Sequence, residues 1–560
     1  MASAAIARPR FVRETAAQQG SGIAYDRLML VMLLFVGAIF LISARLTQLQ
    51  MSADQTLTSA VASGLPARGE IVDRNGVVLA TTIEAWAIGV QPEKVIGDKM
   101  ELAAKLNELM PEQSAEWYLA ALNSRARFTY MRRRAEPELV QAVNALGEPG
   151  ITFGRESERL YPQASVGAHV LGWVGTDGQG AAGIERSLQD RLIADQSRGQ
   201  PIALSIDSRV QAAMEEELNT AIQNLSAEGG SGIVLDVDTG EIVALASGPG
   251  FNPNVPGGAA PEALRNNATL GAYELGSTFK PLTVAAAMDA GVTRPSDHWD
   301  TSPVPIGRFH ISDSHPVGRA LTVPEILTHS SNTATARIAD QMGAERMNGL
   351  FRSLHFNERV PIELRERAGT LYPRDWARST VMTSGFGHSI AITPLHLASA
   401  YAALVNGGMW RPATLLRIQG QAPAGQRVFS AETSHKMRQM LRLIVTDGTG
   451  KKADAEGFRL GGKTGTAEKA GAGGYSHSVN VSTFVGAFPM DRPRYVILVM
   501  LDAPHATAET GGQTTAAWTA APVVRNVIAR TGALLGIIPD AGRDIDLAGM
   551  RELVAGAQGD

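Results

Sequence analysis

The chain of 560 residues contains no cysteine. This absence excludes disulfides, thiolate zinc sites and cysteine nucleophiles, and it is compatible with an oxidising compartment without proving one. The net charge is only −4, and no lysine-rich tract alternates with aromatic residues, so the sequence does not indicate nucleic-acid binding. The histidines, His388 and His477 among them, lack the paired spacing of metal ligands. We therefore expect neither a metal nor a cofactor.

Long uncharged apolar runs are absent except for one, Leu28 to Ala44. A membrane-spanning helix needs about 20 apolar residues, with a lower limit of about 17. A cleaved signal peptide is the alternative, but its apolar region would be shorter, roughly 7–15 residues, and "SARLTQLQ" is a poor cleavage site. Four arginines precede the run: Arg8, Arg10, Arg13 and Arg27. After the run comes Arg45, followed by mostly neutral residues. This bias of positive charge predicts that the N-terminus lies in the cytoplasm and the bulk of the chain outside. We expect a cytoplasmic tail over residues 1–27 and an uncleaved anchor over residues 28–48.

A chain of this length exceeds one ordinary hydrophobic core, so two or more domains are expected. Residues 49–199 mix short strand-like runs with a helical pattern near Lys99–Met110. From about Pro201 a helical stretch, a strand-turn-strand pattern, two later strands and a helix interrupted by Pro522 follow one another. This order predicts an antiparallel sheet covered by helices over residues 200–540. The segment 541–560 is largely polar, and we expect a loosely held tail there.

Charged residues gather in "LPARGEIVDRNG", where Arg68, Asp73 and Arg74 surround the turn formers Gly69 and Asn75-Gly76. From the residues alone, the better interpretation is a hairpin with a solvated charge cluster.

The stretch "YELGSTFKPLT" contains a serine and a lysine three residues apart, Ser277 and Lys280. If Gly276-Ser277 opens a helix, the two side chains share one face. A serine hydroxyl is a weak nucleophile unless a base takes its proton, and a lysine serves as that base only when burial or neighbouring cations keep it neutral. The apolar run after Pro281 supplies such a setting, and a helix N-terminus favours an oxyanion. Alone, however, a Ser-x-x-Lys pattern is expected by chance in a chain of this size.

Two further stretches are weak signals when taken singly. In "THSSNTATARIAD", the triplet Ser330-Ser331-Asn332 could simply cap the helix that follows. In "LGGKTGTAEK", Lys463-Thr464-Gly465-Thr466 could be a basic turn before a strand. Its glycines would also let an extended substrate lie close along a sheet edge, and its lysine and hydroxyls suit a carboxylate.

Together and in this order, the three motifs resemble those of the penicillin-recognising acyl-serine transferases, the penicillin-binding proteins and serine β-lactamases. The resemblance covers nearly the whole chain. "RGEIVDRNG", "RLYPQASVGAHVLGWVG" and "GAAGIERSLQD" resemble pedestal motifs of class B penicillin-binding proteins, while "YELGSTFK", "HSSNTATARIA", "FGHSIAITPLHLASAYAALVNGG" and "GGKTGTAEK" resemble the transpeptidase core. Chain length, the lack of added C-terminal repeats and the wording of "YELGSTFK" favour the division-specific FtsI type. Leu275 departs from the family, which usually has proline there.

The resemblance implies a role for each motif residue in peptidoglycan cross-linking. Ser277 would attack the penultimate D-Ala of a stem pentapeptide, Lys280 would take its proton, and Ser330 would relay a proton to the leaving amine. Asn332 would hold the substrate amide and orient Lys280. Lys463, Thr464, Gly465 and Thr466 would bind the terminal carboxylate, and the backbone N–H groups of Ser277 and Thr466 would form the oxyanion hole. β-Lactams would acylate Ser277 in a dead end.

The resemblance also implies a fold class and partners. It predicts one N-terminal membrane helix in the inner membrane, an elongated α+β pedestal over residues 49–199, and a periplasmic α/β transpeptidase domain of serine β-lactamase type. Arg68, Asp73 and Arg74 would then serve the pedestal in partner binding, for which an FtsW-type glycosyltransferase and other division proteins are the expected partners. An elongation-specific transpeptidase remains an alternative. A β-lactamase or carboxypeptidase fits the anchor, pedestal and C-terminal segment less well, and a β-lactam sensor would need an output domain.

Overall fold

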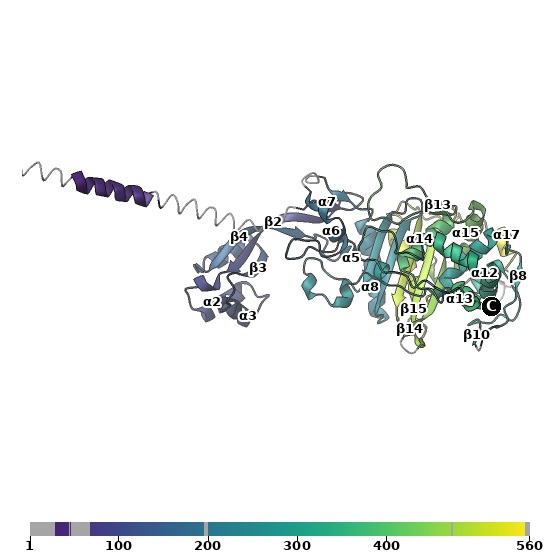
Figure 1. Ribbon diagram of the computed structural model, residues 1–560. Coiled ribbons are helices and arrows are strands. Elements are labelled where there is room, and N and C mark those ends of the chain that lie inside the picture. Colours follow the sequence, from purple (N-terminus) through teal and green to yellow (C-terminus); the bar gives the residue numbers. More distant parts are fainter. Residues whose placement is uncertain are drawn as a thin grey trace, which may run out of the picture. The chain divides into compact units, whose positions relative to one another are not determined.

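The computed structural model describes residues 29–43, 45, 68–194, 200–307, 309–471 and 474–554. Residues 29–43 are helical, and the remainder of the expected anchor lies outside the described residues apart from Arg45. Within the described part of the chain, no helix is long and apolar enough to cross a membrane. The chain divides into two compact units (Figure 1), of which one has Glu84–Glu158 as its body and the other contains residues 68–83 and 159–554.

The first unit is a small α+β body with its own apolar core. Side-chain caps begin two of its helices, where Asp98 accepts the backbone N–H groups of Met100 and Glu101 and Ser114 accepts that of Trp117. Leu106, Met110 and Leu122 are fully buried in its core. Its helices and strands are β2 (Val78–Val90), η1 (Pro92–Lys94), α2 (Lys99–Leu109), α3 (Ala115–Leu122), β3 (Thr129–Ala135), α4 (Pro137–Asn144) and β4 (Ile151–Leu160). Strands β2 and β4 continue into the second unit.

The second unit includes segments on both sides of the first in the sequence. Residues 68–83 and 159–194 lie within the predicted pedestal of residues 49–199, and their contacts group them with the C-terminal unit. The physical reason is a shared core, because Tyr161, Leu171 and Ile184 belong to the same apolar cluster as the main sheet. The elements of these segments are β1 (Ile71–Val72), α5 (Ala168–Leu171), α6 (Gly183–Ser187), α7 (Gln189–Ile193) and, after them, β5 (Ile202–Ala203), which pairs with β1 in parallel.

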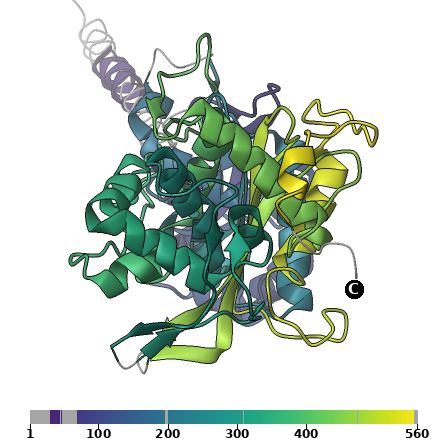
Figure 2. The ribbon, with the colours of Figure 1, turned by 90° about the vertical axis from the view of Figure 1, so that its right-hand side faces the viewer.

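A five-stranded antiparallel sheet forms the centre of the second unit, with strand order β14-β15-β16-β6-β7. Strand β16 is apolar on both faces: Leu498 and Met500 face one core, and Ile497 and Val499 face the other. Such a run occurs where helices cover both faces of a sheet, and Figure 2 shows helices on both sides of it. The strands are β6 (Gly229–Asp236), β7 (Ile242–Gly248), β14 (Gly461–Gly471), β15 (Gly474–Phe488) and β16 (Tyr495–Asp502).

One face of the sheet is covered by two helices and the other by a larger group. Helices α8 (Ser208–Asn224) and α16 (Ala520–Thr531) pack against each other and on the first face. The larger group comprises α9 (Asn267–Leu270), α10 (Lys280–Asp289), α11 (Val323–Thr328), α12 (Asn332–Ser353), α13 (Arg378–Ser384), α14 (Pro394–Val405), α15 (Ala431–Thr446) and α17 (Ala548–Arg551). This part of the chain also contains short antiparallel strand pairs. They are β8 (His298–Trp299) with β11 (Leu321–Thr322), β9 (Val304–Ile306) with β10 (Phe309–Ile311), and β12 (Met409–Trp410) with β13 (Gln426–Arg427).

The predicted helix-covered antiparallel sheet is confirmed, and three local expectations are corrected. Pro522 does not interrupt a helix, because α16 begins at Ala520 and places the proline in its first turn, where a missing N–H costs little. The segment "GGKTGTAEK" is itself an edge strand of the sheet rather than a turn before one. The C-terminal segment packs against the core up to Val554, since Ile545, Leu547 and Met550 are buried there.

Candidate active site

Ser277 lies on a single turn of 3-10 helix, η5 (Gly276–Phe279), which leads directly into α10. The residues after it are fully buried, whereas Ser277 is half-buried. The Tyr401 hydroxyl donates to the Thr278 carbonyl at 2.8 Å, and the Phe279 ring packs against two phenylalanine rings of the core. The turn is therefore fixed from the protein interior, and its serine faces outward.

Glycines allow three backbone segments to meet at this turn. Gly276 has a left-handed φ of 55°, and a Cβ on Gly387 would come within 2.2 Å of the Gly276 carbonyl oxygen. A Cβ on Gly465 would lie 2.5 Å from the Leu275 carbonyl oxygen. The sequence suggested that the glycines of the Lys-Thr-Gly motif leave room for a substrate. In the structure, the missing side chain of Gly465 lets β14 pack against the serine turn, and the substrate role of the motif stays a prediction.

Lys280 is fully buried at the start of α10. Its ammonium donates to the Ser330 carbonyl and, at 3.0 Å, to Ser330 Oγ. Burial, and after it the charge of Lys463, holds the pKa of Lys280 well below its ordinary value, while Asp313 acts in the opposite direction. Among the hydrogen bonds of the described residues, none joins Lys280 to the hydroxyl of Ser277. The burial expected of this lysine is thus confirmed, and its hydrogen bonds are directed to Ser330.

Ser330 joins the second and third motifs to the first. Its hydroxyl accepts from Lys280 Nζ and from Lys463 Nζ, each at 3.0 Å. Its backbone is left-handed, with φ of 60°, an uncommon state for serine that depends on its surroundings. The helix-cap interpretation applies to its neighbour instead, because Ser331 Oγ accepts the backbone N–H of Ala334 and caps α12.

The Lys-Thr-Gly motif lies on β14, the edge strand beside the serine turn. Lys463 is fully buried, which lowers its pKa to about 7, and its ammonium also donates to the Thr464 carbonyl at 3.0 Å. The Thr464 hydroxyl contacts the Thr449 hydroxyl at 2.9 Å, and the Thr466 hydroxyl accepts the backbone N–H of Ala516 at 3.1 Å. Both threonine hydroxyls are therefore held in place. The "GTGKK" segment containing Thr449 carried no signal in the sequence.

Among the hydrogen bonds of the described residues, none joins Asn332 to Lys280, so the expected orienting role of Asn332 stays a prediction. Its side-chain amide donates to the Ser312 carbonyl at 3.3 Å, while its backbone N–H donates to Asp313 at 2.6 Å. Asp313 also accepts hydrogen bonds from Ser331 and Thr333, the neighbours of Asn332. Sequence reasoning missed this aspartate because a single acid in "ISDSHP" has no motif to mark it.

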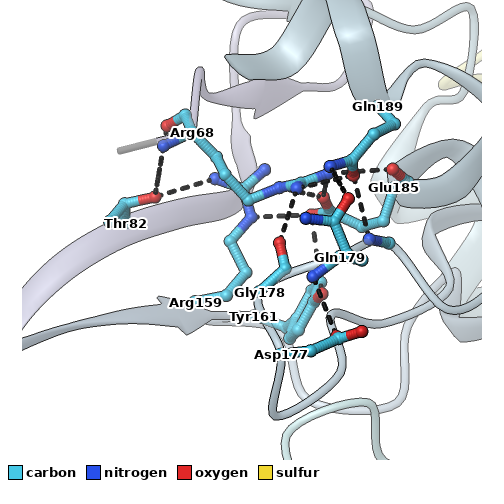
Figure 3. Close-up of polar contacts among 10 residues, drawn as sticks. Arg68, Thr82, Arg159, Tyr161, Asp177, Gly178, Gln179, Glu185 and Gln189 are labelled. Atoms are coloured by element: carbon cyan, nitrogen blue, oxygen red, sulfur yellow. Dashed lines mark hydrogen bonds and ion pairs between the residues drawn. The ribbon is translucent and has the colours of Figure 1, made fainter. Parts of the chain in front are cut away.

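Arg68, expected to serve partner binding, lies inside the second unit. Its guanidinium forms an ion pair with the fully buried Glu185 at 2.8 Å and donates to the Glu185 carbonyl at 2.8 Å (Figure 3). Arg159 contacts the other oxygen of Glu185 at 2.6 Å, and Gln189 accepts from Arg68 at 2.7 Å. Both the solvated-cluster interpretation and the partner role fail for Arg68, because its side chain is only 2% exposed.

Asp73 is also structural. Its carboxylate accepts the backbone N–H groups of Asn75, Val77 and Ser208 and the Ser208 hydroxyl, and it is 1% exposed. The Arg74 side chain is partly exposed to solvent and forms an ion pair with Glu241 at 3.4 Å. Of the three pedestal residues, only Arg74 retains a solvent-facing side chain.

A helix-covered antiparallel sheet with a Ser-x-x-Lys turn packed on its edge strand defines the penicillin-recognising serine enzymes. Comparisons with known proteins agree. A model of the penicillin-binding protein transpeptidase domain matches residues 230–528, and one of the penicillin-binding protein dimerisation domain matches residues 63–201. The chain therefore belongs to the penicillin-binding proteins, and the dimerisation domain places it in their class B.

Individual relatives share most of their length with this chain. The probable peptidoglycan D,D-transpeptidase FtsI of Caulobacter vibrioides is 39% identical over 483 residues, which cover 84% of this chain and 82% of that protein. Peptidoglycan D,D-transpeptidase FtsI of Escherichia coli is 31% identical over 509 residues, covering 85% and 84%. Among solved structures, penicillin-binding protein 3 from Mycobacterium tuberculosis complexed with aztreonam superimposes with a TM-score of 0.67 at 26% identity, covering 85% of this chain and 98% of that one.

Proposed function

We propose that this D,D-transpeptidase of FtsI type cross-links stem peptides at the division septum and that Ser277 carries its acyl-enzyme. The observation that carries the proposal is the pair of buried lysines, Lys280 and Lys463, whose ammonium groups meet on the Ser330 hydroxyl next to the serine turn. Two amines close together in an apolar setting favour the neutral form that a base requires.

Acylation begins when Ser277 Oγ bonds to the carbonyl carbon of the penultimate D-Ala and its proton passes to the neutral amine of Lys280. The negative charge that develops on the carbonyl oxygen is met by the backbone N–H groups of Ser277 and Thr466. These segments are in close contact, because a Cβ on Gly276 would lie 3.0 Å from the Thr466 carbonyl oxygen. The C–N bond then breaks, and the terminal D-Ala leaves with a proton delivered through the Ser330 hydroxyl.

Substrate binding is assigned to the edge strand and to α12. Lys463 and the hydroxyls of Thr464 and Thr466 bind the terminal carboxylate, and Gly465 contributes by letting that strand approach the serine turn. The half-buried amide of Asn332 binds the substrate amide. The amine of a second stem peptide then attacks the acyl carbonyl, and Ser277 leaves as the restored hydroxyl.

β-Lactams, which mimic D-Ala-D-Ala, acylate the same serine in this proposal. The complex of the similar penicillin-binding protein 3 with aztreonam supports this. We also retain the proposed anchor over residues 28–48, in an inner membrane with the catalytic domain in the periplasm, and the proposed domains over residues 49–199 and 200–540. An FtsW-type glycosyltransferase remains the proposed partner, with Arg74 the pedestal residue exposed enough to contact it.

The proposal is tested in cells that depend on this chain. Under depletion of the wild type, Ser277→Ala is expected to give long filaments with blocked septa, and Ser353→Ala, at the far end of α12, is expected to restore division. Rounded cells that still constrict would assign the chain to elongation, the second candidate. Normal division with Ser277→Ala would contradict the proposed nucleophile.

A further inference from the structure

The carboxylate of Asp313, a residue outside the three motifs, accepts hydrogen bonds with both of its oxygens at the candidate site. One oxygen accepts the backbone N–H groups of Asn332 and Thr333 at 2.6 and 2.9 Å. The other accepts the hydroxyls of Ser331 and Thr333 at 2.7 and 3.0 Å. A single side chain from the segment after β10 thus holds three consecutive residues at the start of α12.

These three residues directly follow Ser330. Because the left-handed backbone of Ser330 is uncommon, its neighbours must fix it for its hydroxyl to stay between Lys280 and Lys463. The Ser331 backbone N–H also donates to the Ile326 carbonyl at 3.0 Å, so contacts on both sides of the turn contribute. Asp313 supplies the contacts on the α12 side.

The charge of Asp313 also acts on Lys280. The titratable groups that face Lys280 are Lys463 from β14, His388 from the segment after α13, and Asp313. Asp313 is the acid among them, and it opposes the burial and the Lys463 charge that lower the pKa of Lys280.

We propose that Asp313 is a positioning residue of the transpeptidase site: by holding residues 331–333 it fixes Asn332 at the start of α12 and keeps the Ser330 hydroxyl between Lys280 and Lys463. The inference rests on the proposed roles of Ser277, Lys280 and Ser330. It assigns the geometry of the second motif to a residue outside the three motifs.

The test compares Asp313→Asn with the wild type in the rate of acylation by a fluorescent penicillin between pH 5 and pH 10. Asparagine has nearly the same shape and keeps an oxygen for the two backbone N–H groups, but it removes the charge. Loss of the carboxylate loosens residues 331–333, so the acylation rate is expected to fall, and a lysine that loses a nearby carboxylate gives up its proton more easily, so the acidic limb of the profile is expected to move to lower pH. A wild-type rate together with an unshifted limb overturns the proposal.

Matched controls separate charge from structure. Asp300→Asn removes an acid that is 61% exposed and paired with Arg337, so its profile is expected to match the wild type. His388→Gln is measured in parallel, so that the titration of His388 is not mistaken for that of Lys280. If Asp313→Asn does not fold, Asp313→Glu takes its place: it keeps the charge but displaces the oxygens, so the limb stays while the rate falls at least tenfold. A wild-type rate in that variant contradicts the positioning role.

Failure of the proposed function would be distinct. Labelling of Ser277→Ala, or no labelling of the wild type, would remove Ser277 as the nucleophile. The Asp313 comparison is made on wild-type protein whose labelling depends on Ser277.

Discussion

At the residue scale, the molecule buries two lysines completely, Lys280 and Lys463. A charged ammonium is strongly disfavoured in such surroundings unless it is paired or loses its proton. Here the hydrogen-bond acceptors are hydroxyl and carbonyl groups, which hold a neutral amine as well as an ammonium ion. The same burial that destabilises the charged form therefore prepares the base.

The first residue-scale prediction concerns Lys280→Arg. A guanidinium stays charged at every working pH, so it cannot accept the Ser277 proton, and the acylation rate should fall by about 10²–10⁴. Stopped-flow acylation by a penicillin measures this. Lys452→Arg, which changes a lysine stacked on Trp518, should acylate at the wild-type rate. Retention of more than a tenth of the rate in Lys280→Arg would exclude Lys280 as the base.

The second residue-scale prediction concerns Lys463. Burial lowers the pKa of this lysine to about 7. Its ammonium is charged below that pH and neutral above it, and only the charged form attracts a substrate carboxylate. The KM of a D-Ala-D-Ala ester or thioester analogue should therefore rise as the pH increases through 7. In Lys463→Arg, which keeps its charge, KM should be nearly independent of pH over this range. A wild-type KM that falls with increasing pH would contradict the carboxylate role.

At the element scale, the sequence predicted the sheet and the motifs but not how they fit together. Alternating and fully apolar runs identify strands and helices because burial imposes their periodicity, so β6, β7, β15 and β16 were predictable. The role of Gly465 was not predictable, because the atom that requires a glycine there is the carbonyl oxygen of Leu275, 190 positions earlier in the chain. The prediction that Pro522 interrupts a helix was wrong because the helix begins only at Ala520, and a proline is tolerated in a first helical turn. Helix starts are located poorly by sequence patterns.

This contact gives a prediction for Gly465→Ala. The added methyl group would press on the Leu275 carbonyl at 2.5 Å and push the edge strand away from the serine turn. Overpacking of this kind costs about 1–3 kcal/mol, and penicillin acylation should fall by about tenfold or more. Gly349→Ala on α12, where a methyl group would meet nothing within 4 Å, should leave acylation unchanged and raise the melting temperature slightly. Equal acylation in both variants would show that the strand and the turn need no close approach.

At the scale of the whole molecule, the sequence indicated charged residues of the N-terminal region as partner-binding, and the structure places most of them in the interior. Glu185 is 117 positions from Arg68 and lies in "GAAGIERSLQD", a stretch separate from the charged one that contains Arg68. No local pattern joins these positions, so the buried ion cluster could not be inferred before the fold was known.

Arg68→Ala should now destabilise the second unit. Removing one of the two arginines that pair with the buried Glu185 leaves that carboxylate with Arg159 alone, and breaking a buried ion pair costs up to about 3–5 kcal/mol. Thermal unfolding should show a clearly lower melting temperature, and labelling should be lost at temperatures where the wild type is still labelled. Arg74→Ala, at a partly exposed position, should unfold near the wild-type temperature. An unchanged melting temperature in Arg68→Ala would restore the interpretation as a docking residue.

The central claim is that Ser277 forms the acyl-enzyme. The most direct test is to treat the purified chain with a penicillin, digest it and locate the adduct by mass spectrometry. The account predicts one acyl group per chain, on the peptide that contains Ser277, and no adduct in Ser277→Ala that has kept its fold. An adduct on another serine, or one that persists in Ser277→Ala, would contradict the account.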